Sequence, residues 1–480
     1  MLEQESVPIL NALKEYIKDD VTPFDVPGHK NRGNDNELKD CLGEEIFKYD
    51  VNSKINLDNL IKPTGVIKDA QKLMANAFGV DEALFLVNGT TIGIQSMIMS
   101  VCRPGEKLII PRNVHKSVLN ALILCGIIPV FIEPEISTEY GIFMNVTEDK
   151  MINIIRDNPD AKAVLVINPT YYGVTTNLEP IVYEAHKHNM LVLADEAHGS
   201  HFYFNDKYPA PAMRMGADMS CVSLHKTGGS LTQSSALLIN STKVDPKKVK
   251  ATLNLLQTTS GSYLLMASLD VARKNLALTG EAKLDKVVDI CVEGRKKINV
   301  LDGYHVLDEQ EITKHNMKSI DLSKLCICVK DTGLSGFEVV NLLRSECRIQ
   351  MELGDMYNIL AVISLDDTTQ DLDKLVKALK YIRENHSKDT KLNFDFKSLS
   401  IPKTLLNPRD AFFSDKKYVN LKDAVNKISG DTIIVYPPGI PIVSIGEEIN
   451  KEIADYIEDM FNQGVEIIGM VDDTIAIIEY

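Results

Sequence analysis

Apolar and polar positions along the middle of the chain follow two alternating patterns. Between about residues 66 and 240, short apolar runs such as 83–88 and 163–168 are separated by longer stretches with apolar residues three and four positions apart. The short runs predict buried strands and the longer stretches predict amphipathic helices. Regular alternation of the two predicts an α/β fold, with a mostly parallel sheet covered by helices.

The pattern differs on either side of this region. Residues 3–19 predict an amphipathic helix, and helical stretches at 245–280 and 282–299 lead out of the sheet. Beyond them, strands and helices mix in the manner of smaller α+β domains. The expected later elements are strands near 317–329 and 349–366, helices near 335–346, 369–385 and 420–428, a strand at 432–436, a turn at 436–441, a helix at 447–462 and a final strand pair.

These changes of pattern predict four parts. They are an N-terminal helix and segment (1–65), a large α/β domain (66–300), a small α+β domain (301–390) and a C-terminal α+β domain (391–480). A chain of 480 residues is long enough for such a multi-domain arrangement.

Composition narrows the partners and the compartment. The net charge of −15 argues against nucleic acid or an anionic membrane surface, and the short basic run 246–250 is explained by a solvated helix start. No apolar run approaches the ~20 residues of a membrane span, and the acidic N-terminus lacks a signal-peptide pattern. Eight cysteines form no disulfide framework or zinc pattern. We therefore expect a cytoplasmic protein without a metal, membrane or nucleic-acid partner.

The most informative chemistry lies around Lys226. This residue follows Ser223 and His225, and it stands 31 positions after Asp195, which ends the apolar run 190–194. A lysine amine can form a Schiff base with the aldehyde of pyridoxal phosphate (PLP), and the neighbouring hydroxyl and imidazole can hold the phosphate. A carboxylate at a strand end can keep the pyridine nitrogen protonated. The pattern predicts a PLP site.

A second segment has the features of a phosphate-binding turn. The strand at 83–88 is followed by Gly89, Thr90 and Thr91 and then by an apolar helix. Free N–H groups and the dipole at a helix N-terminus attract anions. Taken alone, the turn is equally well explained by Thr90 as an ordinary helix N-cap. Together with the lysine and the acid, it indicates a phosphate cradle.

The acidic segment also has a competing interpretation. Asp195, Glu196, His198 and His201 could form a metal cluster, because carboxylate and imidazole groups are zinc ligands. That interpretation leaves Lys226 and the Gly/Thr turn without a purpose.

Motifs spread over nearly the whole chain carry a resemblance to a known family. The chain resembles the ornithine/lysine/arginine decarboxylases of PLP fold type I, in particular the short form of Gram-positive bacteria. The matching segments, in the order of the family, are Pro27–Lys30, Leu57–Leu60, Pro63–Ile67, Val87–Thr91, Arg112–Ser117, Asn168–Val174, Ala194–Gly199, Ser223–Lys226, Gln257–Ser260 and Tyr436–Pro441.

The resemblance implies a role for each matching residue at the cofactor ring. Lys226 would form the Schiff base and Asp195 would pair with the pyridinium. His115 would stack on the ring and help to protonate the carbanion, with Ala197 on the opposite face and His198 near the ring edge.

The resemblance also implies how phosphate and substrate are held. The phosphate would contact Gly89, Thr90, Thr91, Ser223 and His225, together with Thr259 or Ser260 of a second subunit. A homodimer or higher homo-oligomer with a shared active site follows. Glu352 would lie near the distal cation of a basic amino-acid substrate.

The implied activity is decarboxylation of a basic amino acid. L-arginine, giving agmatine for polyamine synthesis, is the first expectation, followed by lysine (giving cadaverine) and ornithine. Departures from the family pattern at Asn52–Ser53, Gly261 and Ile445 remove no catalytic group. Aminotransferases and β-eliminating lyases share the fold and the Asp/Lys pair, and Arg348 is a candidate carboxylate clamp for the former. A non-catalytic regulator is a third alternative.

Overall fold

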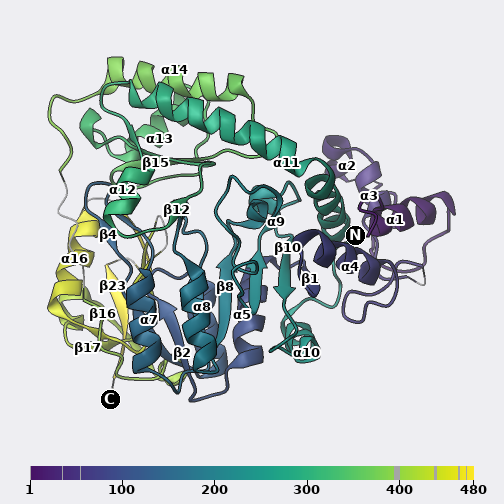
Figure 1. The fold of residues 1–480 in the computed structure, drawn as a ribbon, viewed down its shortest axis with the longest axis horizontal. Helices are drawn as coiled ribbons and strands as arrows, with labels where there is room; N and C mark the ends of the chain where they lie inside the picture. Colours follow the sequence, from purple (N-terminus) through teal and green to yellow (C-terminus); the bar gives the residue numbers. More distant parts are fainter. Residues whose placement is uncertain are drawn as a thin grey trace. The chain divides into compact units, whose positions relative to one another are not determined.

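The largest sheet of the molecule has seven strands (Figure 1). The structure, a computed structural model, describes residues 2–34, 36–54, 56–393, 400–436, 440–462, 465–471 and 473–479. The strands follow the order β1 (Glu82–Leu86), β10 (Ser235–Ile239), β9 (Met219–Val222), β8 (Leu191–Glu196), β6 (Ala163–Ile167), β2 (Lys107–Pro111) and β3 (Ile128–Ile132).

Helices alternate with these strands along the chain, as the sequence predicts. They are α4 (Val66–Phe78), α5 (Gly89–Val101), α6 (Lys116–Cys125), α7 (Glu148–Asp157) and α8 (Leu178–Lys187). Strand β2 pairs in parallel with β3 and β6, which confirms the α/β prediction. Strand β10, absent from the prediction, runs antiparallel to both β1 and β9.

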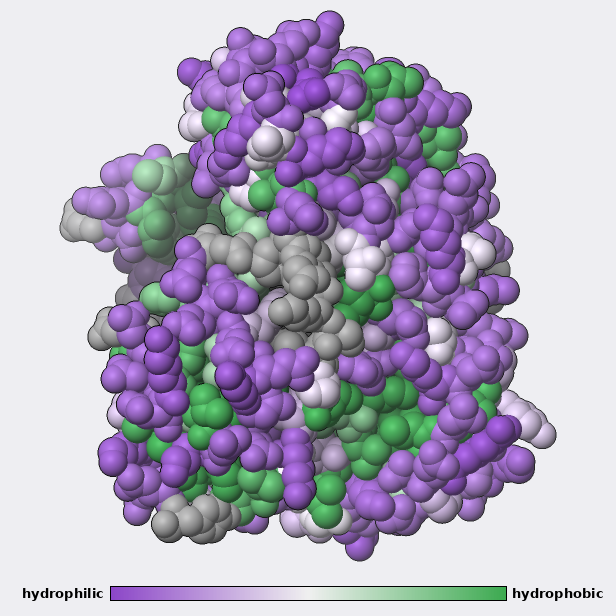
Figure 2. Space-filling model, turned by 90° about the vertical axis from the view of Figure 1, so that its left-hand side faces the viewer, coloured by the Kyte–Doolittle hydropathy of each residue, from purple (hydrophilic) through white to green (hydrophobic). Residues whose placement is uncertain are grey.

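The chain divides into two compact units. The first comprises Met1–Ser100 and Ala194–Asp285, and the second comprises Val101–Leu193 and Lys286–Tyr480. Figure 2 shows one face on which hydrophilic side chains dominate and smaller apolar patches lie between them, an ordinary surface for a globular protein. Among the described residues, no helix is both long enough and apolar enough to cross a membrane.

In the first unit, helix α5 packs very closely on the sheet at Gly93. A Cβ at this position would lie 2.5 Å from Cys221 Sγ of β9 and 2.6 Å from a methyl of Leu86 of β1. Only glycine allows that approach without displacing a neighbour. The same helix begins at Gly89, whose φ of +75° favours glycine as well. Glycines thus fix both the start of α5 and its depth on the sheet.

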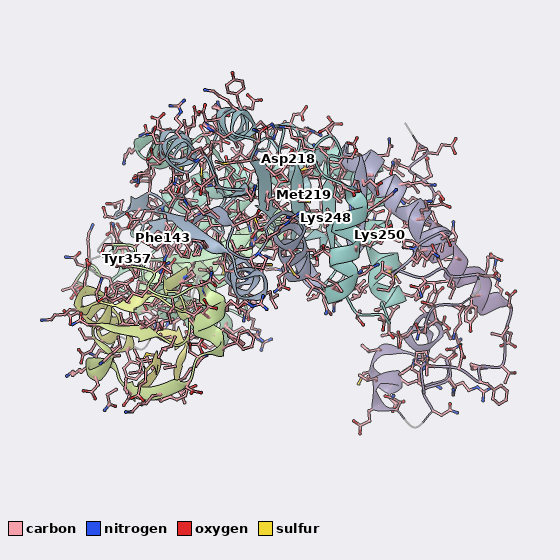
Figure 3. The ribbon with its side chains drawn as sticks, turned by 90° about the horizontal axis from the view of Figure 1, so that it is seen from below. Phe143, Asp218, Met219, Lys248, Lys250 and Tyr357 are labelled. Atoms are coloured by element: carbon pink, nitrogen blue, oxygen red, sulfur yellow. The ribbon has the colours of Figure 1, made fainter. Side chains whose placement is uncertain are left out.

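Helix α10 (Pro246–Leu256) confirms the expected solvated helix start at the basic run. Asp245 caps the helix by accepting from Lys247 N at 2.9 Å. Lys248 is exposed and Lys250 is half-buried; both are labelled on this helix in Figure 3. The basic residues therefore belong to the first turns of a surface helix.

The expected helices at 245–280 and 282–299 are divided differently. A break at 257–262 separates α10 from one long helix, α11 (Tyr263–Asn299). The segment at the break is rich in Thr, Ser and Gly, which favour turns over helix interiors. Two bonds hold it to the β1–α5 turn: Val87 N donates to Gln257 Oε1 (3.4 Å) and Thr258 N donates to Asn88 Oδ1 (3.1 Å).

The N-terminal helix is shorter than expected. Helix α1 spans Pro8–Lys18, whereas the prediction was 3–19, and it has a proline in its first turn.

The second unit contains a smaller antiparallel sheet in addition to β6, β2 and β3. Its order is β11 (His305–Val306), β13 (Lys324–Cys328), β15 (Asn358–Val362) and β14 (Leu353–Gly354). Helices α13 (Gly336–Ser345) and α14 (Thr369–His386) agree with the expected positions. Cys326 and Cys328 both join one buried cluster, because residues two apart share a face of a strand.

The prediction of a helix near 420–428 is wrong. Leu421, Ala424, Val425 and Ile428 have helical spacing, but the structure has a short 3₁₀ turn, η3 (Leu421–Ala424), followed by strand β17 (Lys427–Ser429). Asn426 interrupts the helical path with a φ of +62°. Ile428 then pairs with strand partners on both sides of β17. Pairing within the sheet therefore overrides the local periodicity.

The remaining C-terminal elements agree with the sequence in type. Helix α16 spans Lys451–Asn462, four residues shorter at its start than expected, and β18 spans Ile433–Tyr436. The expected final strand pair is present as β22 (Met470–Val471) and β23 (Thr474–Ile478), and a further strand, β21 (Glu466–Ile468), precedes it and pairs with β18. Residues 437–439 of the expected turn lie outside the described residues.

Candidate active site

Lys226 lies on a very short helix directly after strand β9. This helix, α9 (Leu224–Thr227), follows Ser223, whose carbonyl accepts from Lys226 N at 3.2 Å. The lysine is exposed, and its Nζ lies 2.9 Å from His198 Nε2. An amine at a strand end with an imidazole in hydrogen-bond contact is suited to Schiff-base chemistry.

Three hydroxyls meet at the N-terminus of helix α5. Thr90 Oγ1 lies 2.5 Å from Ser223 Oγ and donates to Ser235 Oγ at 2.9 Å, and all three residues are buried. The preceding residue, Gly89, donates its N–H to the carbonyl of Gln233 at 2.8 Å and has open space where a Cβ would point. Hydroxyls beside a helix N-terminus form a cradle suited to a phosphate.

The sequence did not single out Ser235. It begins β10, the antiparallel strand that was also missed, so no predicted element placed it beside Thr90. The sequence feature that points to Ser235 is the polar segment Thr232–Ser235, which stands at the start of an apolar run. Thr91, the last residue of the predicted turn, is exposed.

Asp195 lies at the carboxyl end of strand β8, as expected. Its carboxylate accepts from Ala197 N at 3.1 Å, and the residue is 9% exposed. A largely buried acid at this edge can hold a pyridinium proton, because the opposite charge favours the protonated ring. Ala197 is half-buried in the turn that follows.

Glu196, the next residue, has a different environment. It is fully buried, and its carboxylate accepts from Tyr203 OH (2.5 Å), Ser220 Oγ (2.6 Å) and Ala212 N (2.7 Å). Burial, together with the Glu196 charge, raises the pKa of Tyr203 well above its usual value, so the phenol remains a donor. Glu196 thus anchors β8 from within the protein. In the described ranges no group of three or more His, Cys, Asp or Glu side chains is arranged to hold a metal ion.

His225 is oriented by a backbone carbonyl. Its Nδ1 lies 2.8 Å from the carbonyl oxygen of Ser234, an acceptor, so Nδ1 carries a proton and Nε2 is left for a ligand. Burial lowers the pKa of the imidazole; the bond to Ser234 opposes this shift, and the neighbouring Lys226 adds to it. The first unit therefore carries an amine, an acid and an anion cradle, which together fit PLP.

Thr259 and Ser260 lie in the break between α10 and α11. Both residues are exposed in this chain. Ser260 N donates to Thr258 Oγ1 at 3.3 Å, which helps to hold the turn. Two hydroxyl side chains are thus presented on the outside of the first unit.

His115 lies in the second unit, at the N-cap of helix α6. Its Nδ1 accepts from Ser117 N at 3.2 Å and lies 2.9 Å from Ser117 Oγ. The imidazole is exposed. The cap contacts at Nδ1 thus fix the orientation of the imidazole.

A buried ion pair holds the segment that leads to His115. Arg112 follows β2, and its guanidinium donates to both carboxylate oxygens of Glu447, each at 2.7 Å, and to the carbonyl of Ile442 at 2.7 Å. Both charged side chains are at most 7% exposed. A two-pronged contact of this kind fixes orientation as well as distance. It ties the C-terminal part of the chain to the end of β2.

Glu352 is exposed and has a tyrosine as partner in the same unit. Tyr171 OH donates to Glu352 Oε1 at 2.5 Å. Three residues later, the buried Asp355 accepts from Tyr172 OH at 2.7 Å and from Asn358 N at 2.7 Å. Burial raises the pKa of Asp355 to about 6, although these donors oppose the shift. Two consecutive tyrosines thus contact two acids of the β14 segment.

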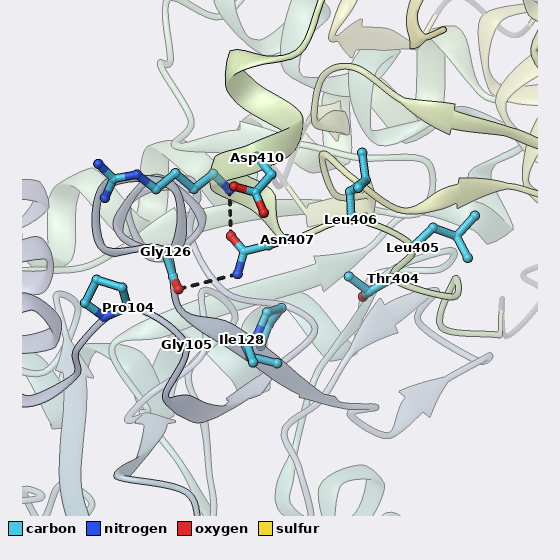
Figure 4. Close-up of a pocket in the computed structure, with 11 residues that line it drawn as sticks. Pro104, Gly105, Gly126, Ile128, Thr404, Leu405, Leu406, Asn407 and Asp410 are labelled. Carbon is cyan, nitrogen blue, oxygen red and sulfur yellow. Dashed lines mark hydrogen bonds between the residues drawn. The ribbon is translucent and has the colours of Figure 1, made fainter. Parts of the chain in front are cut away.

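A pocket of the second unit is lined by none of the predicted site residues (Figure 4). Its volume is about 450 Å³, and Asn407 donates to the carbonyl of Gly126 at 3.4 Å along its wall. Its lining residues are Pro104, Gly105, Gly126, Ile128, Pro129, Thr404, Leu405, Leu406, Asn407, Arg409 and Asp410. None of these is a nucleophile or a catalytic base of the predicted chemistry.

Arg348, the candidate carboxylate clamp of the aminotransferase alternative, is exposed.

Comparison with known proteins identifies the family. Residues 7–371 match the Orn/Lys/Arg decarboxylase major domain, and residues 394–473 match the C-terminal domain of the same family. An arginine decarboxylase of Bacillus subtilis is 41% identical, covering 99% of this chain and 98% of the relative. One of Halalkalibacterium halodurans is 40% identical, covering 99% and 97%.

Solved structures agree on the fold. The lysine decarboxylase of Francisella novicida superposes with a TM-score of 0.85 at 22% identity, over 99% of this chain and 81% of that protein. A Nostoc alanine–glyoxylate aminotransferase gives a TM-score of 0.55 at 15% identity, over 68% of this chain and 88% of that protein. The full-length match to both family domains decides between the fold's chemistries: the chain belongs to the Orn/Lys/Arg decarboxylase family and is a PLP-dependent amino-acid decarboxylase.

Proposed function

We propose that this enzyme decarboxylates L-arginine to agmatine and CO2, a reaction that supplies polyamine synthesis. The observation that carries the proposal is the pair of arginine decarboxylases that are 41% and 40% identical over almost the full length of both chains. The lysine decarboxylases among the relatives are more distant, for example 22% identical in Hafnia alvei. Lysine and ornithine remain the alternative substrates.

In this proposal the first unit binds the cofactor. PLP, when bound, withdraws electrons from the substrate Cα as CO2 leaves. Lys226 binds the aldehyde carbon and Asp195 holds the proton on the pyridine nitrogen. The phosphate is held by the hydroxyls of Thr90 and Ser223, with Ser235 behind Thr90, at the turn that begins with Gly89. These assignments rest on the contacts between the three hydroxyls and on the largely buried carboxylate.

The remaining cofactor contacts follow from the family resemblance. Thr91 and His225 complete the phosphate site, Ala197 packs on one face of the ring and His198 lies near its edge. His115 stacks on the other face and, with Lys226, is a candidate to return a proton to Cα. The contacts of Nδ1 with Ser117, which fix the orientation of the His115 imidazole, support that role.

Glu352 is assigned to the distal cation of the substrate. Its exposed carboxylate can accept two N–H groups of a planar guanidinium, a geometry that an ammonium does not share. The bond from Tyr171 OH occupies one of its oxygens and limits the orientations of the carboxylate. Binding energy from this remote group can then orient the bond to be broken.

The active unit in this proposal is a homodimer in the cytoplasm, with Thr259 or Ser260 reaching the phosphate of the other subunit. The exposed position of both hydroxyls supports this arrangement. So do the apolar side chains on the surface of the same unit, with Phe24 95% and Leu255 78% exposed.

Parallel CO2-release assays on L-arginine, L-lysine and L-ornithine test the proposal. The purified protein is supplied with PLP, and the amine products are identified. We expect a strong preference for arginine with agmatine as product. A preference for lysine or ornithine would replace the proposed substrate. Amine transfer to a keto acid without CO2 would contradict the reaction itself.

A further inference from the structure

The contact between Lys226 and His198 has a consequence for the chemistry of the lysine. Lys226 Nζ and His198 Nε2 are 2.9 Å apart, a hydrogen-bond distance. His198 is 7% exposed, in the turn that follows β8, so its imidazole is largely removed from water. A hydrogen bond between these two nitrogens contains a single proton, which one nitrogen donates and the other accepts. One partner must therefore act as the acceptor.

A second contact fixes the two segments that carry this pair. Ser200 Oγ lies 2.7 Å from Thr227 Oγ1, and both residues are buried. Ser200 stands two positions after His198, and Thr227 stands one position after Lys226. Two side-chain contacts thus join the turn after β8 to α9. The imidazole is held beside the amine by the local fold.

We propose that His198 is a catalytic residue that accepts a proton from the Lys226 amine and returns it. The inference rests on the proposed role of Lys226. An ammonium group has no lone pair, so Lys226 must lose one proton before its nitrogen can attack the aldehyde carbon of PLP. His198 Nε2 takes that proton. The new carbon–nitrogen double bond then replaces the carbonyl, and its oxygen leaves with the two remaining nitrogen protons as water. His198 Nε2 finally returns its proton to the nitrogen of the new double bond.

Other titratable groups lie on the segments that carry the pair and bear on what a pH profile would report. They are Asp195 and Glu196 of β8, His201 of the 3₁₀ helix Ser200–Phe204 and His225 of α9. Glu196 is bound by three donors, and Asp195 accepts a backbone N–H. His225 is turned toward Ser234. His198 is the imidazole that lies within hydrogen-bond distance of the Lys226 amine, at 2.9 Å.

The test measures cofactor loading, independently of turnover. Apo-protein is mixed with PLP, and absorbance is followed with time at pH 7 and pH 9. Borohydride reduction and peptide mass analysis then quantify the label on Lys226. His198→Gln retains a hydrogen-bonding amide but cannot take a proton. We expect it to label Lys226 about 10²-fold more slowly than the wild type at pH 7, and the gap to narrow at pH 9, where more of the amine is already neutral. His188→Gln, a control in the second unit, should load at the wild-type rate.

The outcomes separate this inference from the proposed function. If the wild type gives no label on Lys226, the proposed role of the lysine fails. If the wild type is labelled and His198→Gln loads equally fast at both pH values, the role of His198 is overturned. Should His198→Gln not fold, His198→Ala with added imidazole decides: acceleration by imidazole supports proton transfer, and its absence rejects it.

Discussion

The two units hold their site residues in different ways. In the first unit the hydroxyls of Thr90, Ser223 and Ser235 are buried and bonded to one another at strand and helix ends. In the second unit Glu352 is exposed, with a phenol as its partner in the same unit. Under the proposed assignments, side chains of the packed interior hold the phosphate of the cofactor. The distal cation of the substrate is held by a surface side chain, which can change without repacking a core.

Replacing Lys226 is expected to have the largest effect. Lys226→Ala removes the amine that is proposed to bind the cofactor and to donate a proton, and it should lower kcat at least about 10³-fold. CO2 release measures the loss, and the borohydride label should disappear. Lys248→Ala, on the exposed start of α10, should leave both unchanged. Retention of wild-type turnover in Lys226→Ala would remove the basis for placing the cofactor in the first unit.

Changing Glu352 tests the proposed role of the exposed carboxylate of the second unit in substrate binding. Glu352→Gln keeps the shape but loses the charge, so kcat/KM for arginine should fall roughly 10- to 100-fold, the value of a hydrogen bond to a charged group. Tyr171→Phe should cost less, about fivefold, because it removes a neutral donor. Cofactor loading should be unchanged in both.

A matched control exists in the same unit. Glu346 accepts from Tyr381 OH at 2.9 Å on the surface, so Glu346→Gln reproduces the chemical change at an unrelated place. It should leave kcat/KM at the wild-type value. Equal effects at Glu346 and Glu352 would show that Glu352 has no special place in substrate binding.

Glycine 93 tests how rigidly the phosphate cradle is built. Gly93→Ala places a methyl group 2.5 Å from Cys221 Sγ and should lower the free energy of unfolding by about 1–3 kcal/mol. Gly280→Ala, in α11, meets its nearest atom at 3.5 Å and should range from neutral to about 1 kcal/mol more stable. Urea unfolding distinguishes them. Equal stabilities would mean that the packing of α5 on the sheet is not tight.

The last prediction concerns pH and the buried Asp355. Its pKa is raised from 3.8 to about 6 by burial, so the folded state binds a proton that the unfolded state releases between about pH 4 and 6. The stability from this group is therefore full below about pH 4 and is lost as pH rises through about 6. Asp355→Asn should remove that slope. The difference in unfolding free energy between wild type and variant, measured from pH 4 to 7, reports it.

Local sequence patterns predicted much of the fold, including the elements that carry the candidate cofactor site. The strand–turn–helix at Gly89 and the acid-ended strand at Asp195 lie where their patterns place them, because buried strands and helix starts have local signals. Ser235 was missed because its strand is antiparallel and its neighbour Thr90 is 145 residues away. The same limit applies at 420–428, where pairing of Ile428 with Ile478 overrides a helical spacing.

The Arg112–Glu447 pair also bears on the order of events during synthesis. The two residues are separated by 335 positions, and a guanidinium buried without its carboxylate would cost about 3–5 kcal/mol. A growing chain that has not yet reached Glu447 carries that arginine without its partner. The segment leading to His115 therefore takes its final form only late in translation, after the sheet residues before it have long left the ribosome.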